Sequence, residues 1–220
     1  MNYGAFIYKK EVLTASELND VAKLALNFSD ERKSMHESGK YASLGWYKYS
    51  LDPDLEFVKK LLKSIGADKA ELIDFYYLDP GAVLHPHRDL TGASLNNRLR
   101  FHVPVITNPK ISFRVSDEKM DMMPGDLWCL DTSYVHSVRN DGDESRVHIV
   151  IECYLSDQIK KNIPNDWKSK LHSIYFAAVM VGELCKALVI NLFKDPKYLY
   201  IQMKMVVRFI KWRFFGFPRD

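Results

Sequence analysis

Four short segments decide the fold of this chain, and they are LRFHVPVI (99–106), KISFRV (110–115), GDLWCLD (125–131) and RVHIVIECYL (146–155). Several of them alternate apolar and polar residues at period two, which is the pattern of half-buried β-strands. Turn-forming pairs such as Asn108-Pro109 and Pro124-Gly125 separate them. Regularly spaced short strands of this kind favour an all-β barrel or sandwich between about Ala70 and Leu155.

Residues before this β region have mixed helical and strand patterns. Thr14-Ala-Ser-Glu17 is a capping-box sequence and predicts a helix that begins there and runs to about Leu26. Asp52-Pro53-Asp54 predicts the start of a second helix near Pro53, which we expect to end at Gly66. The aromatic-rich residues 45–51 are expected to form a strand.

The C-terminal residues form a basic extension. From Lys161 onward there are eleven Lys and Arg residues against four Asp and Glu, whereas the whole chain has a net charge of +3. The apolar residues 174–193 include Glu183, which argues against a membrane span, and residues 197–215 form a second helical pattern. We expect helices that pack on the barrel, form a homodimer or make peripheral contact with an anionic membrane, and the sequence leaves these alternatives open.

Length and composition are those of one globular domain, with 220 residues, 47% hydrophobic and 27% charged. Cys129, Cys153 and Cys185 lie far apart without a CxxC pair, so neither a disulfide framework nor a zinc cluster is indicated. The N-terminus lacks the long apolar stretch of a signal peptide. These features favour a reducing, cytoplasmic location, with peripheral membrane contact as an alternative, and no nucleic-acid partner is expected.

The sequence His87-Arg88-Asp89, followed by His136, contains candidate metal ligands. Two imidazoles and one carboxylate can bind iron(II) on one face and leave the opposite face open for a co-substrate and dioxygen. In an extended strand His85 would share a face with His87 and Asp89, so either neighbouring pair in that series could chelate a metal. The short motif is weak evidence by itself because it arises often by chance.

Two strand-like segments have a polar face where an apolar one is expected. In residues 98–103, Arg98, Arg100 and His102 alternate with apolar residues, and Arg146 and His148 do the same in residues 146–151. A sheet with one face in solvent gives the same alternation. Because burying an unpaired guanidinium is costly, arginines inside a barrel would instead imply an anionic partner, such as a dicarboxylate.

The region from His85 to Cys153 resembles the aspartyl/asparaginyl β-hydroxylase family of iron(II)- and 2-oxoglutarate-dependent dioxygenases. The matching elements are HRD at 87–89, NRLRFHVPV at 97–105, MPGDLW at 123–128, His136 with Val138 and Asn140, and RVHIVIE at 146–152. They cover about a third of the chain in the family's order, and together they are more specific than the metal-ligand motif alone.

The resemblance implies an α+β protein built on a double-stranded β-helix, also called a jelly-roll or cupin barrel. The chain would then divide into an N-terminal α/β segment (1–69), a catalytic barrel (70–156) and a C-terminal basic helical extension (157–220). Helices of the N-terminal segment would pack on the barrel, and the metal would lie in the barrel mouth.

The resemblance also implies the roles of individual residues. His87, Asp89 and His136 would be the catalytic iron(II) ligands. Arg146 would bind the distal carboxylate of 2-oxoglutarate, and the positions of Arg100 and His102 match residues that contact this co-substrate near the metal. Dioxygen would be the second co-substrate.

The expected function is hydroxylation of an unactivated C–H bond in a small molecule, an amino acid or amino-acid-like substrate. Asp89 favours this branch, because protein aspartyl hydroxylases typically lack the carboxylate ligand. Hydroxylation of a peptide or protein is one alternative. Others are a three-histidine site formed by His85, His87 and His136, and a non-catalytic cupin-type binding protein. Several aromatic residues could line the pocket or belong to the core: Trp46, Tyr47, Tyr49, Tyr76 and Tyr77.

Overall fold

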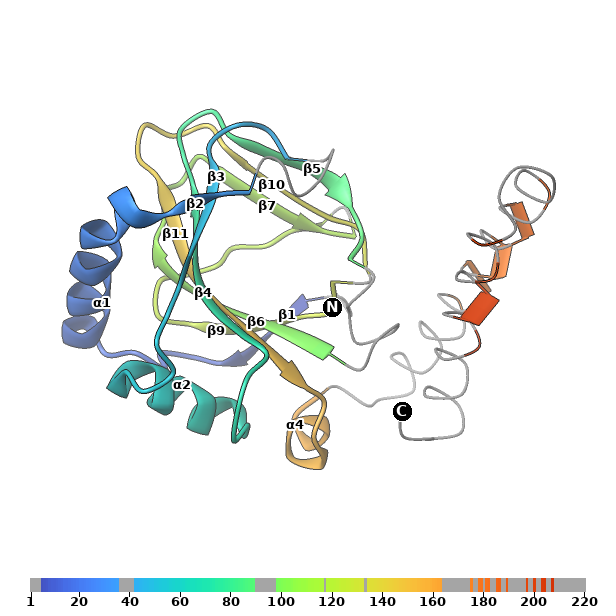
Figure 1. Ribbon diagram of the computed structural model, residues 1–220, viewed down its shortest axis with the longest axis horizontal. Coiled ribbons are helices and arrows are strands. Elements are labelled where there is room, and N and C mark those ends of the chain that lie inside the picture. Colours follow the sequence, from blue (N-terminus) through green and yellow to red (C-terminus); the bar gives the residue numbers. More distant parts are fainter. Residues whose placement is uncertain are drawn as a thin grey trace.

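The computed structural model describes residues 5–35, 42–89, 98–116, 118–132 and 134–163, with separate residues between Tyr175 and Val207. Within this part, two antiparallel sheets face each other across the interior of a barrel (Figure 1). The larger sheet has the strand order β1-β9-β6-β11-β4-β3-β2, and the smaller has the order β5-β10-β7-β8. This is a double-stranded β-helix, so the expected fold class is confirmed.

The strands of the larger sheet, in spatial order, are β1 (Ala5–Lys9), β9 (Leu127–Leu130), β6 (Arg98–Ile106), β11 (Arg146–Tyr154), β4 (Leu72–Leu78), β3 (Trp46–Ser50) and β2 (Lys33–Ser34). Those of the smaller sheet are β5 (Val83–His87), β10 (His136–Asn140), β7 (Ile111–Val115) and β8 (Glu118–Lys119). The three strands that precede residue 70 all belong to the larger sheet. The N-terminal segment therefore contributes strands to the barrel as well as helices, and the domain boundaries remain a prediction.

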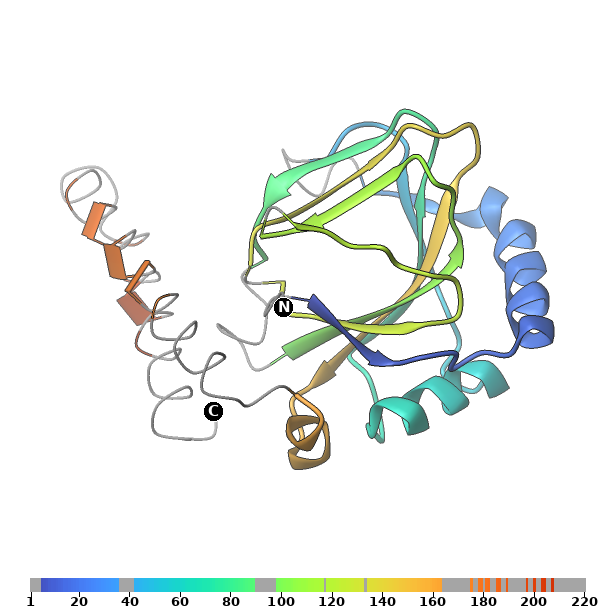
Figure 2. The same ribbon diagram turned by 180° about the vertical axis from the view of Figure 1, so that it is seen from behind.

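The helices cover the outer face of the larger sheet, as the views from both sides show (Figures 1 and 2). Helix α1 (Ala15–Asn27) begins with the expected capping box, in which the Thr14 side chain accepts a hydrogen bond from the backbone of Glu17. Helix α2 (Glu56–Ile65) ends, as expected, at Gly66, whose positive φ of 82° is readily adopted by glycine. A 3₁₀ turn (Ser29–Glu31) follows α1.

The expected start of α2 near Pro53 is wrong by about one helical turn. The helix begins at Glu56, and its N-cap residue Leu55 makes no side-chain capping bond. The carboxylate of Asp52 instead accepts a hydrogen bond from the backbone of Asp54 at 2.8 Å. Asp52 thus stabilises a turn that precedes the helix, which is a common alternative role of aspartate.

Strands β6 and β11 lie side by side in the centre of the larger sheet and carry its two-sided pattern. Leu99, Phe101 and Val103 are almost fully buried in the core beneath the helices. On the alternate face of the same strand, Arg100 and His102 face the barrel interior and line a pocket, whereas Arg98 is not in that lining and donates to the Tyr154 hydroxyl at 2.9 Å. The predicted division of β6 into an apolar and a polar face is confirmed, and the polar face lies inside the barrel rather than in solvent.

Most of the C-terminal extension lies outside the described residues. A short helix, α4 (Asp157–Lys161), is capped by Ser156 and packs Ile159 into the core. The helices expected over 174–193 and 197–215 are represented by scattered helical residues, and the remainder of both ranges lies outside the described part. No helix among the described residues is long and apolar enough to cross a membrane.

Candidate active site

The pairing of β5 with β10 brings together two of the expected metal ligands. His87 lies directly opposite His136 in the antiparallel register, and the centroids of their rings are 4.2 Å apart. The register then shifts, so that Leu84 is the next residue opposite β10, at Val138. This bulge places Leu84 and His87 in the pocket lining.

The bulge also corrects the expectation that His85, His87 and Asp89 share one face. His85 is exposed and is not among the pocket-lining residues, because the extra residue in β5 interrupts the alternation. Asp89 lies just beyond the end of β5, where its backbone N–H donates to the carbonyl oxygen of Thr132 at 2.8 Å. The structure therefore removes His85 from the candidate ligand set.

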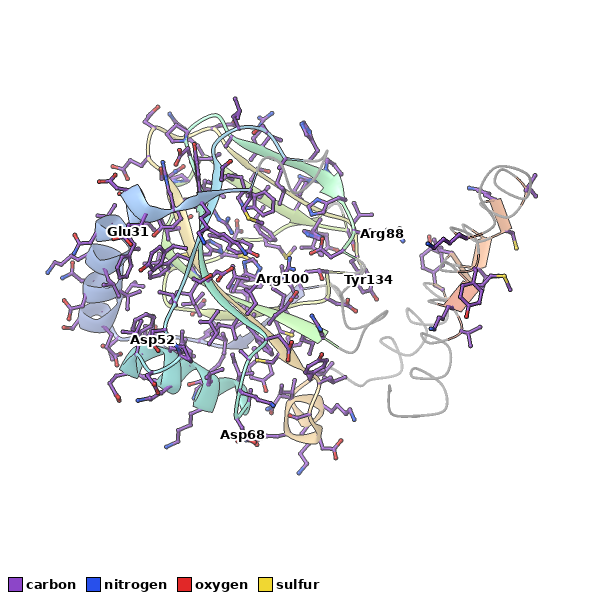
Figure 3. The ribbon with its side chains drawn as sticks, in the orientation of Figure 1. Glu31, Asp52, Asp68, Arg88, Arg100 and Tyr134 are labelled. Atoms are coloured by element: carbon purple, nitrogen blue, oxygen red, sulfur yellow. The ribbon has the colours of Figure 1, made fainter. Side chains whose placement is uncertain are left out.

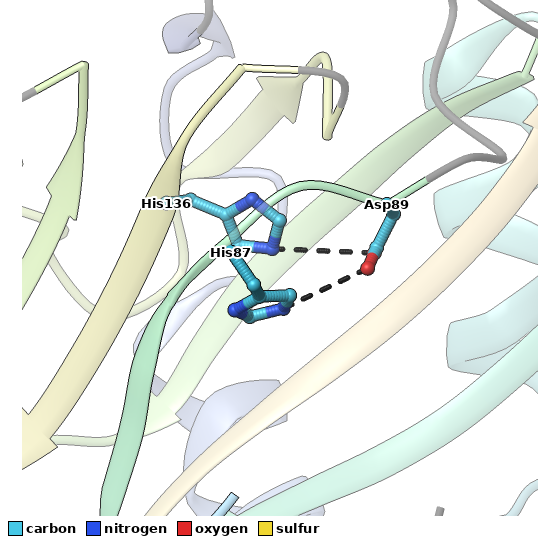
Figure 4. Close-up of side chains that lie close together, drawn as sticks. All are labelled: His87, Asp89 and His136. Carbon is cyan, nitrogen blue, oxygen red and sulfur yellow. Dashed lines mark ion pairs between the residues drawn. The ribbon is translucent and has the colours of Figure 1, made fainter. Parts of the chain in front are cut away.

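His87, Asp89 and His136 form the one group of potential metal ligands found in the described part of the chain. Their ligand atoms all lie within 4.8 Å of one another. The Asp89 carboxylate is 3.6 Å from Nε2 of His87 and 4.0 Å from Nε2 of His136 (Figure 4). Two imidazole nitrogens and one carboxylate oxygen are the donor set of a non-haem iron(II) site with open positions.

Backbone contacts orient both imidazoles toward this centre. Nδ1 of His87 lies 2.7 Å from the carbonyl oxygen of His85, and Nδ1 of His136 lies 3.0 Å from that of Tyr134. Because a carbonyl oxygen can only accept, each Nδ1 carries the proton and each Nε2 presents its lone pair. Burial and the neighbouring His87 lower the pKa of His136 to about 4. His136 is therefore neutral near pH 7, as a metal ligand must be.

A cavity of about 270 Å³ contains this centre and extends into the barrel. Its lining includes the three candidate ligands together with Met35, Trp46, Tyr76, Leu84, Arg100, His102, Phe113, Leu130, Thr132, Val138 and Arg146. All six residues expected to bind the metal or the co-substrate thus border one cavity. Of the five aromatic residues considered as pocket walls, only Trp46 and Tyr76 line it, and Tyr77 instead donates a hydrogen bond to the backbone of helix α1.

At the inner end of the cavity, Arg146 is 3% exposed and has no carboxylate partner among the described residues. Its Nη2 donates to Nδ1 of His148 at 2.6 Å, and its guanidinium lies over the ring of Phe113 at 5.4 Å. Its buried Nε atom makes no hydrogen bond. Burial lowers the pKa of Arg146 to about 9.

A buried guanidinium without an anionic partner is unfavourable, so the part of the cavity beside Arg146 is suited to an anionic group. His102 is also buried here, with Nδ1 3.4 Å from Nδ1 of His148. Burial and the charge of Arg146 hold the pKa values of both histidines well below their usual range. Arg146 is consequently the positively charged group in this part of the cavity, and the neutral His102 and His148 can donate or accept hydrogen bonds. A dicarboxylate fits this set of side chains.

Arg100 has a different environment from Arg146. Its Nη1 donates to the Asp89 carboxylate at 2.7 Å, and its Nη2 donates to Glu152 at 2.7 Å. Among the residues near the site, the sequence analysis missed Glu152 and gave His148 no role. Both lie on the period-two face of β11 that includes Arg146, and that face was the signal that could have identified them.

The model of the aspartyl/asparaginyl β-hydroxylase family matches residues 15–155. The match extends from helix α1 to the end of β11 and therefore contains every candidate ligand described above. No curated protein matches the sequence.

Solved structures with the same fold are distant in sequence. The non-haem α-ketoglutarate-dependent epimerase SnoN from nogalamycin biosynthesis is 15% identical, with a TM-score of 0.53 over 68% of this chain and 76% of that one. A Pseudomonas putida prolyl-4-hydroxylase is 13% identical, with a TM-score of 0.53 over 70% and 94% of the two chains. HygX from Streptomyces hygroscopicus, solved with nickel, 2-oxoglutarate and hygromycin B, is 11% identical, with a TM-score of 0.51 over 68% and 82%. These similarities support the barrel fold.

Proposed function

The chain belongs to the aspartyl/asparaginyl β-hydroxylase family of iron(II)- and 2-oxoglutarate-dependent dioxygenases, and on this premise we propose that it hydroxylates an unactivated C–H bond of a small molecule. The proposed substrate is an amino acid or an amino-acid-like compound. Iron(II) would be held by His87, Asp89 and His136, which form the group with a suitable donor set. Dioxygen would be the second co-substrate.

One observation carries this proposal: a 2-His-1-carboxylate group borders the same cavity as Arg146, which has no carboxylate partner among the described residues. In a metal-binding protein that did not bind 2-oxoglutarate, the buried charge of Arg146 would lack an anionic ligand, and its Nε has no hydrogen-bond partner among the described residues. A binding protein for a dicarboxylate would have no use for the triad. The combination supports a site in which both groups bind at once.

The side chains have separable tasks in such a reaction. His87, Asp89 and His136 would hold the metal on one side, so that the other side faces the cavity. Arg146 would bind the far carboxylate of 2-oxoglutarate and thereby fix its orientation. Iron and 2-oxoglutarate, when bound together with dioxygen, supply the oxidising power needed to hydroxylate an unactivated C–H bond. The protein contributes binding, orientation and exclusion of water.

The proposal of a small substrate is supported by the dimensions and walls of the cavity. Its volume is about 270 Å³, and the co-substrate would occupy part of this space. Met35, Leu84, Trp46 and Tyr76 form an apolar and aromatic part of the lining. The rings of Trp46 and Tyr76 meet edge to face with centroids 5.9 Å apart. Arg88, which lies between His87 and Asp89 in the sequence, is exposed at the outer edge of the barrel and does not line the cavity (Figure 3).

Succinate release from 2-oxoglutarate tests the function. Purified protein, loaded anaerobically with iron(II), would be supplied with oxygen, 2-oxoglutarate and panels of free amino acids, peptides and acyl compounds. We expect substrate-dependent succinate and a hydroxylated product from at least one free amino acid or close analogue. Stimulation by peptides alone would contradict the small-molecule proposal. Failure to bind 2-oxoglutarate in an anaerobic titration would contradict the dioxygenase function itself.

A further inference from the structure

Glu152 is a buried acidic residue that the proposed reaction does not use. It lies near the end of β11, opposite Arg100 in the antiparallel pairing with β6, and is 6% exposed. A carboxylate seldom occupies such a position unless it is paired, because burial of a charge is costly. Its partner is Arg100, which donates to the same Glu152 oxygen from Nη2 at 2.7 Å and from Nε at 3.2 Å.

The same guanidinium reaches the candidate metal centre with its remaining terminal nitrogen. Nη1 of Arg100 donates to Oδ2 of Asp89 at 2.7 Å. Figure 3 shows Arg100 in the interior of the barrel. The two carboxylates raise the pKa of Arg100, which therefore stays charged. Asp89, Arg100 and Glu152 thus form a continuous series of charges in which Glu152 is buried and the other two are partly buried.

The contacts of the two Asp89 oxygens indicate how Arg100 and Glu152 could orient Asp89 toward a bound metal. Oδ2 accepts the hydrogen bond from Arg100 and lies 4.0 Å from Nε2 of His136, whereas Oδ1 lies 3.6 Å from Nε2 of His87 and accepts nothing from Arg100. Asp89 lies beyond the end of β5, so its side chain is not aligned by strand pairing on that side. A fixed guanidinium at Oδ2 would limit rotation of the carboxylate and leave Oδ1 free of hydrogen bonds from Arg100 at the centre.

Arg100 alone would not provide this constraint. An arginine side chain has several rotatable bonds, and without Glu152 the guanidinium could turn to bind both oxygens of Asp89. It would then compete with the metal for Oδ1. Contacts from Nε and Nη2 to Glu152 fix the plane of the guanidinium so that a single N–H faces Asp89.

We propose that Glu152 is a positioning residue for the metal centre, which acts through Arg100 to orient the ligand Asp89. The inference rests on the metal site of the proposed function. It adds a residue that would touch neither metal nor co-substrate and yet set metal affinity. Partners that orient metal ligands in this way commonly change affinity about 10- to 100-fold when they are replaced.

The test compares binding of cobalt(II), used as a spectroscopic substitute for iron(II), by the wild-type full-length protein and by Glu152→Gln. The glutamine keeps the size and an oxygen acceptor but removes the charge. We expect the dissociation constant for cobalt(II) to rise about 10-fold and the visible absorption bands of bound cobalt to shift, because the coordination by Asp89 changes. Glu152→Gln, Arg100→Lys and the double variant should show non-additive effects on affinity, because both residues act through one path.

A matched control is the Arg32–Asp79 ion pair, which is also partly buried and joined by two hydrogen bonds of 2.8 and 3.0 Å. Neither residue lines the cavity. Asp79→Asn should lower thermal stability and leave cobalt affinity and spectrum unchanged. If Glu152→Gln behaves in the same way, Glu152 is merely a structural ion-pair partner and the proposal is overturned. If the wild-type protein binds no cobalt(II), the metal site fails together with the proposal.

Discussion

His87 and His136 face each other across the β5–β10 ladder with their ring centroids 4.2 Å apart, although 48 residues lie between them in the chain. The contact joins β5, which ends at His87, to β10, which follows two further strands of the same sheet along the chain. Asp89 is then placed beside both rings by its backbone hydrogen bond to Thr132. The proposed metal site consequently depends on the pairing of β5 with β10.

Replacement of Asp89 distinguishes the facial triad from a three-histidine site. We expect Asp89→Ala to weaken iron(II) or cobalt(II) binding by at least about 10-fold, since one of the three proposed protein ligands is removed. His85→Ala is the matched control on the same segment, because His85 is exposed outside the cavity. Anaerobic metal titration measures both variants. Strong metal binding by Asp89→Ala together with loss in His85→Ala would support the three-histidine alternative instead.

Replacement of Arg146 should separate function from stability. We expect Arg146→Met to weaken 2-oxoglutarate binding by about 10- to 100-fold, the effect of losing one or two charge-assisted hydrogen bonds. In the absence of 2-oxoglutarate the same variant should melt at a higher temperature than the wild type, because a buried charge without a carboxylate partner among the described residues has been removed. Anaerobic calorimetry and thermal unfolding measure the two effects.

Arg139→Met provides the control for that experiment, since Arg139 is exposed and pairs with Asp141 on the surface. It should alter neither 2-oxoglutarate affinity nor the melting temperature by much, as is usual for surface ion pairs. Undiminished binding of 2-oxoglutarate by Arg146→Met would show that another group holds its distal carboxylate.

The buried histidines should make the metal-free protein sensitive to acid. Burial lowers the pKa of His136 from 6.5 to about 4 and holds the pKa values of His102 and His148 well below 6.5. The unfolded chain therefore binds more protons than the folded protein below about pH 6.5, and the free energy of unfolding should decrease as the pH falls from there toward 4. Each unit of pKa difference corresponds to about 1.4 kcal/mol.

Urea unfolding across this pH range measures the effect. His148→Leu should reduce the slope of stability against pH, because one buried group with a lowered pKa is removed, whereas His85→Ala on the exposed side of β5 should leave the slope unaltered. A wild-type stability that is flat between about pH 6.5 and 4.5 would mean that these imidazoles are protonated in the folded protein.

Deletion of residues 164–220 tests the C-terminal extension. Ile159 in α4 is the last buried residue of the hydrophobic core along the described chain. The shortened protein, which keeps this residue, should therefore fold and retain its metal affinity. Described residues of the extension include exposed apolar side chains at Tyr175, Val189 and Tyr200, and the extension is basic. We expect the full-length protein, and not the shortened one, to sediment with anionic liposomes in a salt-sensitive manner. If the full-length protein is a dimer that does not bind liposomes and the shortened protein is a monomer, the extension contacts a second subunit instead.

The local patterns of the sequence predicted much of the structure correctly. The capping box at Thr14, the glycine end of α2 and the two-faced strand β6 depend on neighbouring residues alone, and all were confirmed. The start of α2 was wrong because Asp52 can cap a helix or stabilise a turn, and both uses look alike in sequence. The sequence could not predict which aromatic residues line the pocket and which belong to the core, because that depends on which face of each strand packs against the helices.

By itself, the sequence determined the residue types of the site and their order, together with the alternation that puts Arg100, His102 and Arg146 on polar faces. Only the tertiary structure decided that His85 is excluded, since a bulge against β10 interrupts its strand. It also decided that the buried Nε of Arg146 has no hydrogen-bond partner in the described part of the chain, while Arg100 joins Asp89 to Glu152. The physical reason is that periodicity fixes the face on which a side chain lies, whereas strand pairing over long sequence distances fixes which charges meet inside the barrel.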